Sequence, residues 1–570
     1  MSKQIVSSGA VSGFLVVSSG GTLEIQSGGV AAFTNVLTGG IEWVDAGGFG
    51  SATVVNGGLE SIQPGAIGLG TIVNAGGMEG VNSGGYASGT IVNGGATQFI
   101  FSGGLASAAT INGGAQVVLA GGTATGTNVR GGGAEGVYGT VVSSIIQSGA
   151  NLAVNSGGVA LNTTISSGGV EFVVGGTDSG AQVSAGIISL QQGTTIGDIL
   201  YSGAVEAVNS GTTASSLFVF GGSLFVFSGG TVNSGSGPGS VVILTGGVAS
   251  NFGFTGAAGI YGSTVSASVG GAFMVRSGAS TISTTVYGSG VEWIDSGAVV
   301  SGTTVSFGGI EWVLPGGKTL HTSLTYSGTQ VINSGGVASS TILTATSATQ
   351  WVLSGGLSVS TTLSGTGPST NEIVLAGGIA SSTTIESVPF ALWSNLGLYG
   401  SALNTIISSG GQEYVGAGAI DSGAHVNSGG IEVVASGGIA VSATMSGGSI
   451  QVLNGGTGSF FFAQGVPSNL QLSDSQHFGG LVAGFGQPDQ IFLPDIAFAP
   501  GTTSAVWTQS GTSGTLLVTN GSHAANLTLL GQYSPASFNV SQNIQAGGGT
   551  VITDPPVAAQ TDLLANSHQT

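Results

Sequence analysis

Pairs of glycine recur along this chain at steps that alternate between short and long, beginning at Gly20, Gly28, Gly39, Gly47 and Gly57. One short and one long step together make a unit of about 18–19 residues, a period typical of repeat architectures in which each unit packs only on its neighbours. The pattern continues, with lapses, to Gly455. Gly makes up 111 of 570 residues without the three-residue period of collagen, so the glycines mark turns between short segments.

Both halves of the unit have the alternating apolar character of a short strand. The short half follows the pattern IEWVDAGG from Ile41, MEGVNSGG from Met78 and TQWVLSGG from Thr349. The long half reads FGSATVVNGG from Phe49 and VVSGTTVSFGG from Val299. The glycines that end each half supply positive φ without steric cost.

Two all-β folds are compatible with this pattern. Asn-Gly is also a hairpin signal, so an antiparallel meander must be considered. However, an aliphatic position recurs once per unit, as at Val44, Ile62 and Val81, and it is not mirrored about each turn. This favours an all-β, right-handed parallel β-solenoid of about 18–19-residue repeats, in which like residues stack on like residues.

The sequence pattern of the repeat changes after Gly455. We expect the β-solenoid to span residues 1–455 and a small C-terminal β-domain, which caps the open coil and carries a possible export signal, to span 456–553. The last 17 residues, 554–570, are polar and proline-containing, and we expect a loosely ordered tail there.

Charge excludes several classes of partner. The net charge is −19, and the four basic residues are Lys3, Arg130, Arg276 and Lys318. Nucleic acid is therefore not an expected partner, because its phosphates require clustered Lys and Arg. No apolar run is long enough for a transmembrane segment, and the N-terminus MSKQIVSSGAVSGFLVV has no continuous apolar core of a Sec signal.

The second position of the short half holds a carboxylate in many units. Glu42, Glu60 and Glu79 occupy successive units, so a solenoid stacks them into a polar ladder. Gln116, Gln330 and Gln350 fill the same position elsewhere, and an amide cannot replace a catalytic carboxylate. We interpret the ladder as a solvated polar rail, with binding of a hard cation such as Ca²⁺ and catalysis as the alternatives.

No residue forms a recognisable catalytic, cofactor-binding or metal-binding motif. The string GGKT at Gly316–Thr319 lacks the earlier glycine and the helix of a phosphate-binding loop, which predicts an ordinary turn. Pectin-degrading β-helix enzymes remain the alternative functional class, but they need clustered charged residues that interrupt the repeat. Ice binding would require a regular threonine ladder, which this chain lacks.

The aromatic residues are the best candidates for contact with a partner. Trp43, Trp293, Trp312 and Trp351 share the third position of the short half. Exposed Trp side chains stack on ligands and are frequent binding hot spots. The alternative is that these four side chains only cover a flank of the solenoid.

The repeats resemble those of a known family. NSGGVALNTTISSGG (Asn155–Gly169) and VNSGGIEVVASGGIAVSATMSGG (Val426–Gly448) are similar to the strand-loop-strand repeats of autotransporter passenger proteins, notably adhesins of the diffuse-adherence type. The resemblance implies a bacterial secreted or cell-surface stalk, non-enzymatic and without cofactors, that acts in adhesion or biofilm formation. Its implied partners are glycans or proteins on host or neighbouring cells.

One departure from the family concerns export. Members of the family end in a membrane β-barrel that we do not recognise in this sequence. Instead, GGLVAGFGQPDQIFLPDIAF (Gly479–Phe498) resembles a unit of large secreted bacterial proteins that are exported through a C-terminal signal. Bacterial export machinery is therefore a further implied partner, and the expected location is extracellular or on the bacterial cell surface.

Overall fold

The computed structural model describes residues 2–365, 370–386, 394–544 and 548–554. Of the predicted C-terminal tail, residues 555–570 lie outside the described residues. The described chain forms two compact units, Met1–Phe273 with Gly278–Ser280, and Met274–Ser277 with Thr281–Thr570.

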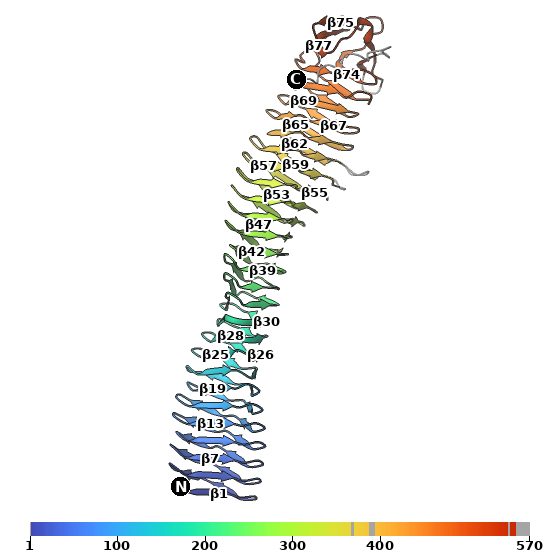
Figure 1. Cartoon of the computed structure of the whole chain (residues 1–570). Helices are drawn as coiled ribbons and strands as arrows, with labels where there is room; N and C mark the ends of the chain where they lie inside the picture. The colour runs from blue at the N-terminus through green and yellow to red at the C-terminus, as the bar shows by residue number, and fades with distance from the viewer. Residues whose placement is uncertain (1, 366–369, 387–393, 545–547, 555–570) are drawn as a thin grey trace, which may run out of the picture. The chain divides into compact units, whose positions relative to one another are not determined.

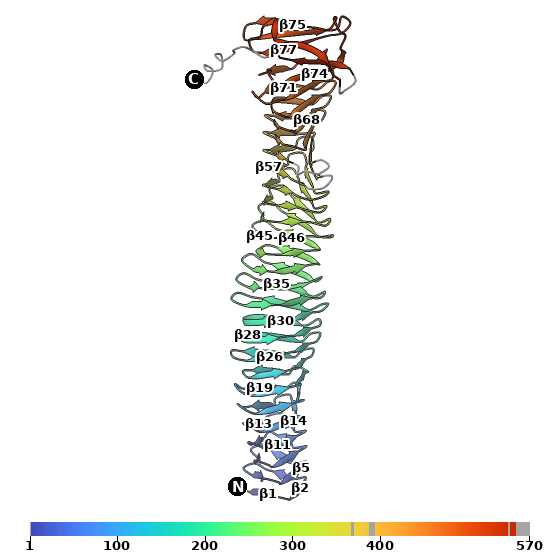
Figure 2. The same ribbon diagram turned by 90° about the vertical axis from the view of Figure 1, so that its right-hand side faces the viewer.

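A coil of the first unit contains three short strands. β7 (Ile41–Val44), β8 (Phe49–Ser51) and β9 (Val54–Asn56) form one coil. The next coil consists of β10 (Leu59–Ile62), β11 (Ile67–Leu69) and β12 (Ile72–Asn74). Each strand pairs in parallel with its equivalent, so that Ile41 faces Leu59, Phe49 faces Ile67 and Val54 faces Ile72. The predicted parallel β-solenoid is confirmed, and within each unit the coils lie on one another (Figures 1 and 2).

The long half of the repeat differs from the prediction because it contains two strands and not one. Ala52 separates β8 from β9 with a φ of 49°. Phe33, Ser143 and Asn162 take the same left-handed conformation at equivalent positions of other coils. Glycine fills this corner in other coils, for example Gly70 and Gly89, so no single residue type marks the corner in the sequence.

The two glycines of a pair serve different purposes. Gly47 has a φ of 75°, which a residue with a Cβ adopts only with strain. Gly48 has no such φ, but a Cβ there would lie 2.5 Å from the carbonyl oxygen of Ile25 in the preceding coil. The pair therefore turns the chain and lets two coils approach closely.

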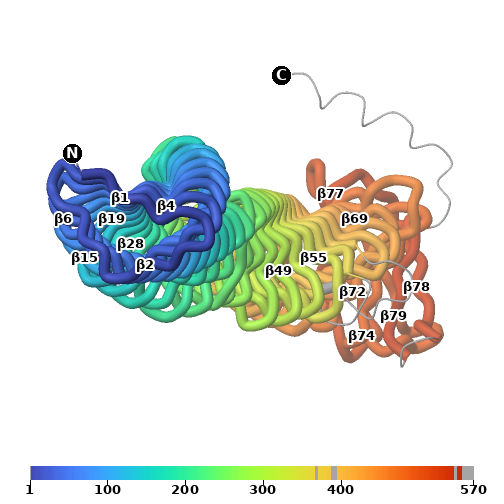
Figure 3. Tube along the Cα trace, turned by 90° about the horizontal axis from the view of Figure 1, so that it is seen from below, coloured from blue at the N-terminus to red at the C-terminus, as the bar shows by residue number. Residues whose placement is uncertain are grey.

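Alternation along each strand separates an inner from an outer face. In β7 the side chains of Glu42 and Val44 are fully buried, whereas Trp43 between them is exposed. Val44 stacks in register on Ile62, and Ile62 on Val81 of β13 (Met78–Val81), all three fully buried. Figure 3 looks along the coils and shows successive turns of the chain overlying one another.

The second unit contains the same coil, for example β47 (Val291–Ile294), β48 (Val299–Ser301) and β49 (Thr304–Val305). Its parallel pairing does not stop at residue 455. β70 (Ser449–Val452) pairs with β72 (Asn469–Leu472), and β72 pairs with β74 (Gln490–Ala497). The inward residues Ile450, Leu470 and Ile491 continue the core. A Gly-Gly pair directly precedes β70, but none directly precedes β72 or β74.

Antiparallel pairing begins after these coils. β75 (Ser504–Ser510), β76 (Ser513–Thr519) and β77 (Ala524–Leu530) form an antiparallel meander, and β77 pairs with β73 (Leu481–Ala483) of the coil stack. A 3₁₀ turn, Pro535–Ser537, leads to β78 (Asn539–Gln542) and β79 (Gly549–Thr553). Segment 456–553 thus belongs to the same compact unit as the coils before it.

Candidate functional site

The predicted ladder of Glu42, Glu60 and Glu79 exists, but it lies inside the solenoid. Glu60 stands in register between Glu42 and Glu79, and none of the three side chains is accessible to solvent. The interpretation as a solvated rail is therefore wrong. The physical reason is the strand period of two, which puts Glu42 on the same face as the core residue Val44.

Amide side chains continue the ladder and link it by hydrogen bonds. The Nε2 atom of Gln98 donates to Glu79 Oε2 at 2.6 Å, and Gln116 Nε2 donates to Gln98 Oε1 at the same distance. Threonine hydroxyls from the residue just before the third strand of the coil join them: Thr90 donates to Glu79 at 3.2 Å and Thr127 to Gln116 at 3.0 Å. A polar column thus runs through an otherwise apolar interior.

The second unit contains a similar column. Glu292 and Glu311 stand in register, followed by Gln330 and Gln350. The Nε2 atom of Gln350 donates to Gln330 Oε1 at 2.6 Å, and that of Gln330 donates to Glu311.

Burial raises the pKa of the column carboxyls. It raises the pKa of Glu42 to about 7, and the hydroxyls of Thr53 and Thr34 moderate this shift. The pKa of Glu60 lies well above its ordinary range, because burial disfavours the charged form and because Glu42 and Glu79 would repel its charge. The column is thus built to hold neutral carboxylic acids, which have the shape and polarity of glutamine.

Aliphatic residues also occupy the column. Leu152 stands in register between Glu135 and Glu171, and Ile188 stands between Glu171 and Glu206. A position shared by Glu, Gln, Leu and Ile serves packing, and a reacting group could not be exchanged in this way. This signal was present in the sequence, in segments such as NLAV from Asn151.

Buried acids gather most densely in two places. Glu171, Asp178, Asp198 and Glu206 are fully buried in the first unit, and Glu413, Asp421 and Glu432 in the second. Burial comes first among the causes that raise the pKa of each of the seven, to about 8 for Glu171. Among the described residues, no three His, Asp or Glu side chains are arranged to hold a metal ion.

The four predicted Trp residues lie on the outer face. Trp43 belongs to the first unit, where its register neighbours are Glu24 and Ser61. In the second unit Trp293 lies beside Trp312, followed by Val331 and then Trp351. Val331 lies in register between Trp312 and Trp351 and is only 7% exposed. We call Trp293, Trp312, Val331 and Trp351 the outer aromatic face.

A second aromatic pair was not foreseen from the sequence. The rings of Phe307 and Tyr326 stack with centroids 5.2 Å apart and planes 6° from parallel. Both are well exposed, at 66% and 57%, on a coil corner where the backbone φ is positive. The signal is an aromatic residue at the same turn position of two successive units, FGG at Phe307 and YSG at Tyr326.

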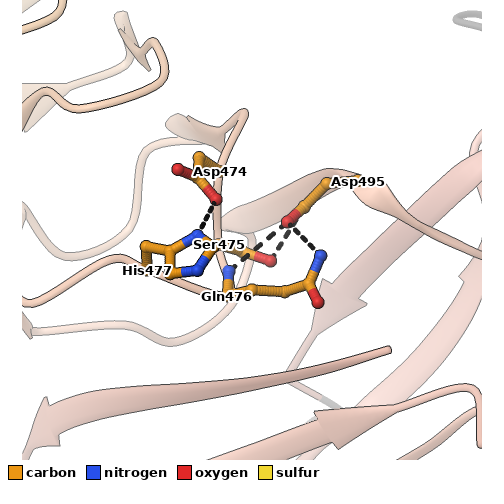
Figure 4. Close-up of polar contacts among 5 residues, drawn as sticks. All are labelled: Asp474, Ser475, Gln476, His477 and Asp495. Carbon is orange, nitrogen blue, oxygen red and sulfur yellow. Dashed lines mark hydrogen bonds and ion pairs between the residues drawn. The ribbon is translucent and has the colours of Figure 1, made fainter. Parts of the chain in front are cut away.

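A cluster of Ser, His and Asp residues follows β72 (Figure 4). The Nδ1 atom of His477 lies 2.7 Å from Asp474 Oδ1, while Ser475 Oγ donates to Asp495 Oδ1 at 2.8 Å. The serine hydroxyl is thus directed to a carboxylate and not to the imidazole, so the cluster lacks the contact that activates a serine nucleophile. It ties the turn after β72 to Asp495 of β74.

Two further expectations from the sequence concern the GGKT string and membrane-spanning segments. Gly316 of GGKT turns the chain with a φ of 79°, and Lys318–Leu320 forms the strand β51, so the string does not lead into a helix. In the described part of the chain, no helix has the length and apolarity to cross a membrane.

Comparisons with known proteins give only distant similarities. No family model matches the chain, and no curated protein is similar to it. A crystal structure of a TibA fragment, residues 55–350, hyper-glycosylated by TibC, is 20% identical with a TM-score of 0.24, covering 79% of this chain and 99% of that one. A mutant tailspike protein of E. coli bacteriophage HK620, solved with a pentasaccharide, is 9% identical with a TM-score of 0.11, covering 94% and 84%. At these scores, nothing about the function of either protein is transferred to this chain.

Proposed function

We propose that this protein is a secreted or surface-exposed bacterial stalk of the adhesin type, which binds partners and catalyses no reaction. The proposal rests on the outer aromatic face, which presents three Trp side chains over four successive coils. The carboxyls of the inner column are buried in the solenoid and are not available to a substrate. The sequence resemblance to autotransporter passenger repeats supports the same function.

Repetition suits such a stalk. Flat aromatic rings offer apolar area and a fixed geometry at low entropic cost, which makes them effective contact residues. Weak contacts repeated along one molecule add up through multivalency. Glycans or proteins on host or neighbouring cells are the proposed partners, with function in adhesion or biofilm formation.

Replacing both Trp312 and Trp351 by alanine tests the proposal. We expect the intact protein to bind a subset of spots on a glycan array and the double variant to lose at least tenfold in signal, because the ring surfaces that make the contact are gone. The single variant Trp43→Ala is the matched control, since Trp43 has no aromatic register neighbour and its loss should leave the signal unchanged.

Two results would contradict the proposal. Absence of binding by the intact protein, both to the array and to whole cells, would leave a stalk without adhesive function. Release of unsaturated or reducing products from polygalacturonate would instead support the alternative class, a pectin-lyase-like enzyme. Circular dichroism of each variant shows whether the fold is retained.

A further inference from the structure

A groove of about 530 Å³ opens on the last coils of the second unit. Its lining comes from β70, β72 and β74 on one side and from β78, β79 and the residues after β78 on the other. The volume falls within the range of roughly 300–1,000 Å³ usual for small-ligand sites. The groove uses no residue of the outer aromatic face.

One continuous sheet surface forms the floor. β70, β72 and β74 pair in parallel, β74 pairs antiparallel with β79, and β79 with β78. Because alternate side chains point to opposite faces, the buried residues of β70, β72 and β74 leave two outward rows in register. They are Ser449, Asn469 and Gln490 in one row, and Gln451, Gln471 and Phe492 in the other.

Antiparallel pairing extends this surface on the far side of β74. Thr553 lies opposite Gln490, and Val551 lies opposite Phe492. Ser541 of β78 follows beside Val551. Gln542 and Asn543 complete the lining where the chain leaves β78.

The lining is uncharged and rich in amides. Six of its fourteen residues are Asn or Gln, two are Ser, one is Thr, and none is acidic or basic. Each side-chain amide offers both donors and an acceptor, the combination that a sugar hydroxyl needs because it donates and accepts at once. Half-buried Phe492 adds the flat apolar surface that the C–H face of a sugar ring covers.

Several of these amides are only weakly engaged by the protein itself. Asn469 Nδ2 reaches Ser449 Oγ at 3.5 Å, and Gln471 Nε2 reaches Ser473 Oγ at 3.2 Å. Gln490 is exposed. Asn469, Gln471 and Gln490 therefore retain hydrogen-bonding capacity for a ligand.

Other ligand classes fit less well. No Lys or Arg follows Lys318 in the whole sequence, so an anionic ligand would find no basic side chain here. β70, β72, β74 and β79 are each paired on both edges, so a peptide cannot pair with any of these four strands as a further strand.

We propose that this groove is a binding site for a neutral oligosaccharide, held by hydrogen bonds to the amides of Gln471 and Gln490 and by stacking on Phe492. The site is separate from the outer aromatic face, and it gives the protein a second, chemically distinct way to contact a polysaccharide.

Calorimetric titration of the full chain tests this site. The probes are the hexamers of four neutral sugars, with β-1,4-glucose, α-1,4-glucose, β-1,4-mannose and β-1,4-xylose linkages, and hexagalacturonate as the anionic comparison. We expect binding of at least one neutral hexamer and at least tenfold weaker binding of hexagalacturonate. Phe492→Ala and, separately, Gln490→Ala should each reduce the affinity for the neutral hexamer at least tenfold.

The variants separate this site from the rest of the molecule. Phe225→Ala is the matched control for Phe492, because Phe225 is a half-buried, outward residue at the same strand position in the first unit. Exposed Gln490 can be replaced without opening the core, so its variant keeps the test valid if Phe492→Ala unfolds.

Three outcomes would overturn the proposal: no binding of any neutral hexamer, equal binding of hexagalacturonate, or full affinity in the folded Gln490→Ala variant. Loss of neutral binding in the Trp312→Ala, Trp351→Ala variant but not in Gln490→Ala would assign the ligand to the outer aromatic face instead. Loss of neutral-hexamer binding only in Gln490→Ala and Phe492→Ala would support the groove as the binding site. The outer aromatic face would then have no role in binding that sugar.

Discussion

Glu42 shows how strongly a single residue depends on its surroundings. It lies between two glycine pairs and beside Trp43 and Asp45, in a segment that resembles an active site. In the structure its carboxyl is fully buried and stacks on Glu60. The exchange of Glu for Gln along the column has a direct cause, since an inner position must be neutral and a protonated Glu matches Gln in shape.

Replacing Glu42 by glutamine should stabilise the protein at pH 8. Burial raises the pKa of Glu42 from 4.5 to about 7, and each pKa unit corresponds to 1.36 kcal/mol, so the upper limit of the gain is about 3 kcal/mol. The gain should vanish near pH 4, where the glutamate is protonated in both folded and unfolded chains. Urea unfolding at the two pH values measures both effects.

Glu24 provides the control for this substitution. It lies on the outer face one coil before Trp43, and the hydrogen bond from Lys3 lowers the pKa of its carboxyl. Glu24→Gln should therefore give no gain at pH 8. Equal stabilisation by both substitutions would mean that general charge repulsion, and not burial of Glu42, is responsible.

At the scale of the strand, the asparagines that precede the glycine turns, including the Asn-Gly dipeptides at Asn56 and Asn93, have a different role from a hairpin signal. Asn74 Nδ2 donates to Asn56 Oδ1 at 2.8 Å, and Asn93 Nδ2 donates to Asn74 Oδ1 at 2.8 Å. A row of asparagines thus connects parallel strands of successive coils. The local sequence is the same in a hairpin and in a coil corner, so only the position of the next strand distinguishes them.

Asn74→Ala should destabilise the first unit by about 1–2 kcal/mol, because it removes two inter-coil hydrogen bonds, each worth about 0.5–1.5 kcal/mol net. Asn151→Ala, at an exposed outward position of the same unit, should change stability by less than about 0.5 kcal/mol. Thermal unfolding followed by circular dichroism compares the two. A larger loss of stability for Asn151→Ala than for Asn74→Ala would show that the asparagine row does not stabilise the stacked coils.

At the scale of the whole chain, the buried acids predict an unusual dependence on pH. Below the ordinary pKa of 4.5 the folded and unfolded chains both hold the protons. Between 4.5 and about 7 the unfolded chain releases them, while Glu42, Glu79, Glu135 and Glu311 retain them when folded. The unfolded state then binds fewer protons, so a rise in pH lowers the free energy of unfolding.

We therefore expect the melting temperature to be highest in mild acid and to fall steadily from about pH 5 to pH 9. Glu171, whose pKa burial raises to about 8, extends the fall above pH 7. Melting curves at pH 4, 6, 8 and 9 measure the trend. Because the chain forms two compact units, each transition is to be fitted separately. A melting temperature that rises with pH would show that the buried acids are ionised in the folded protein.

Periodicity made the architecture predictable from the amino-acid order. The 18–19-residue unit, the glycine turns and the aliphatic position of Val44, Ile62 and Val81 determine parallel stacking, because only equivalent positions can bury one another coil after coil. The three-strand coil was missed because its left-handed corner holds Ala52 or Phe33 in some coils and glycine in others, so no single residue type marks it. The continued coils after residue 455 were missed because no Gly-Gly pair directly precedes β72 or β74.

The sequence alone determined that Glu42 and Trp43 point to opposite faces, since neighbouring residues in a strand always do. Its spacing even placed Glu42 with Val44, but the usual exposure of charged residues suggested the wrong face. Only the tertiary structure decided that the carboxyl is inside, because stacked coils exclude water from it and the resulting desolvation raises its pKa to about 7. Likewise, only the return of β78 and β79 to β74 brings distant amides together into one groove.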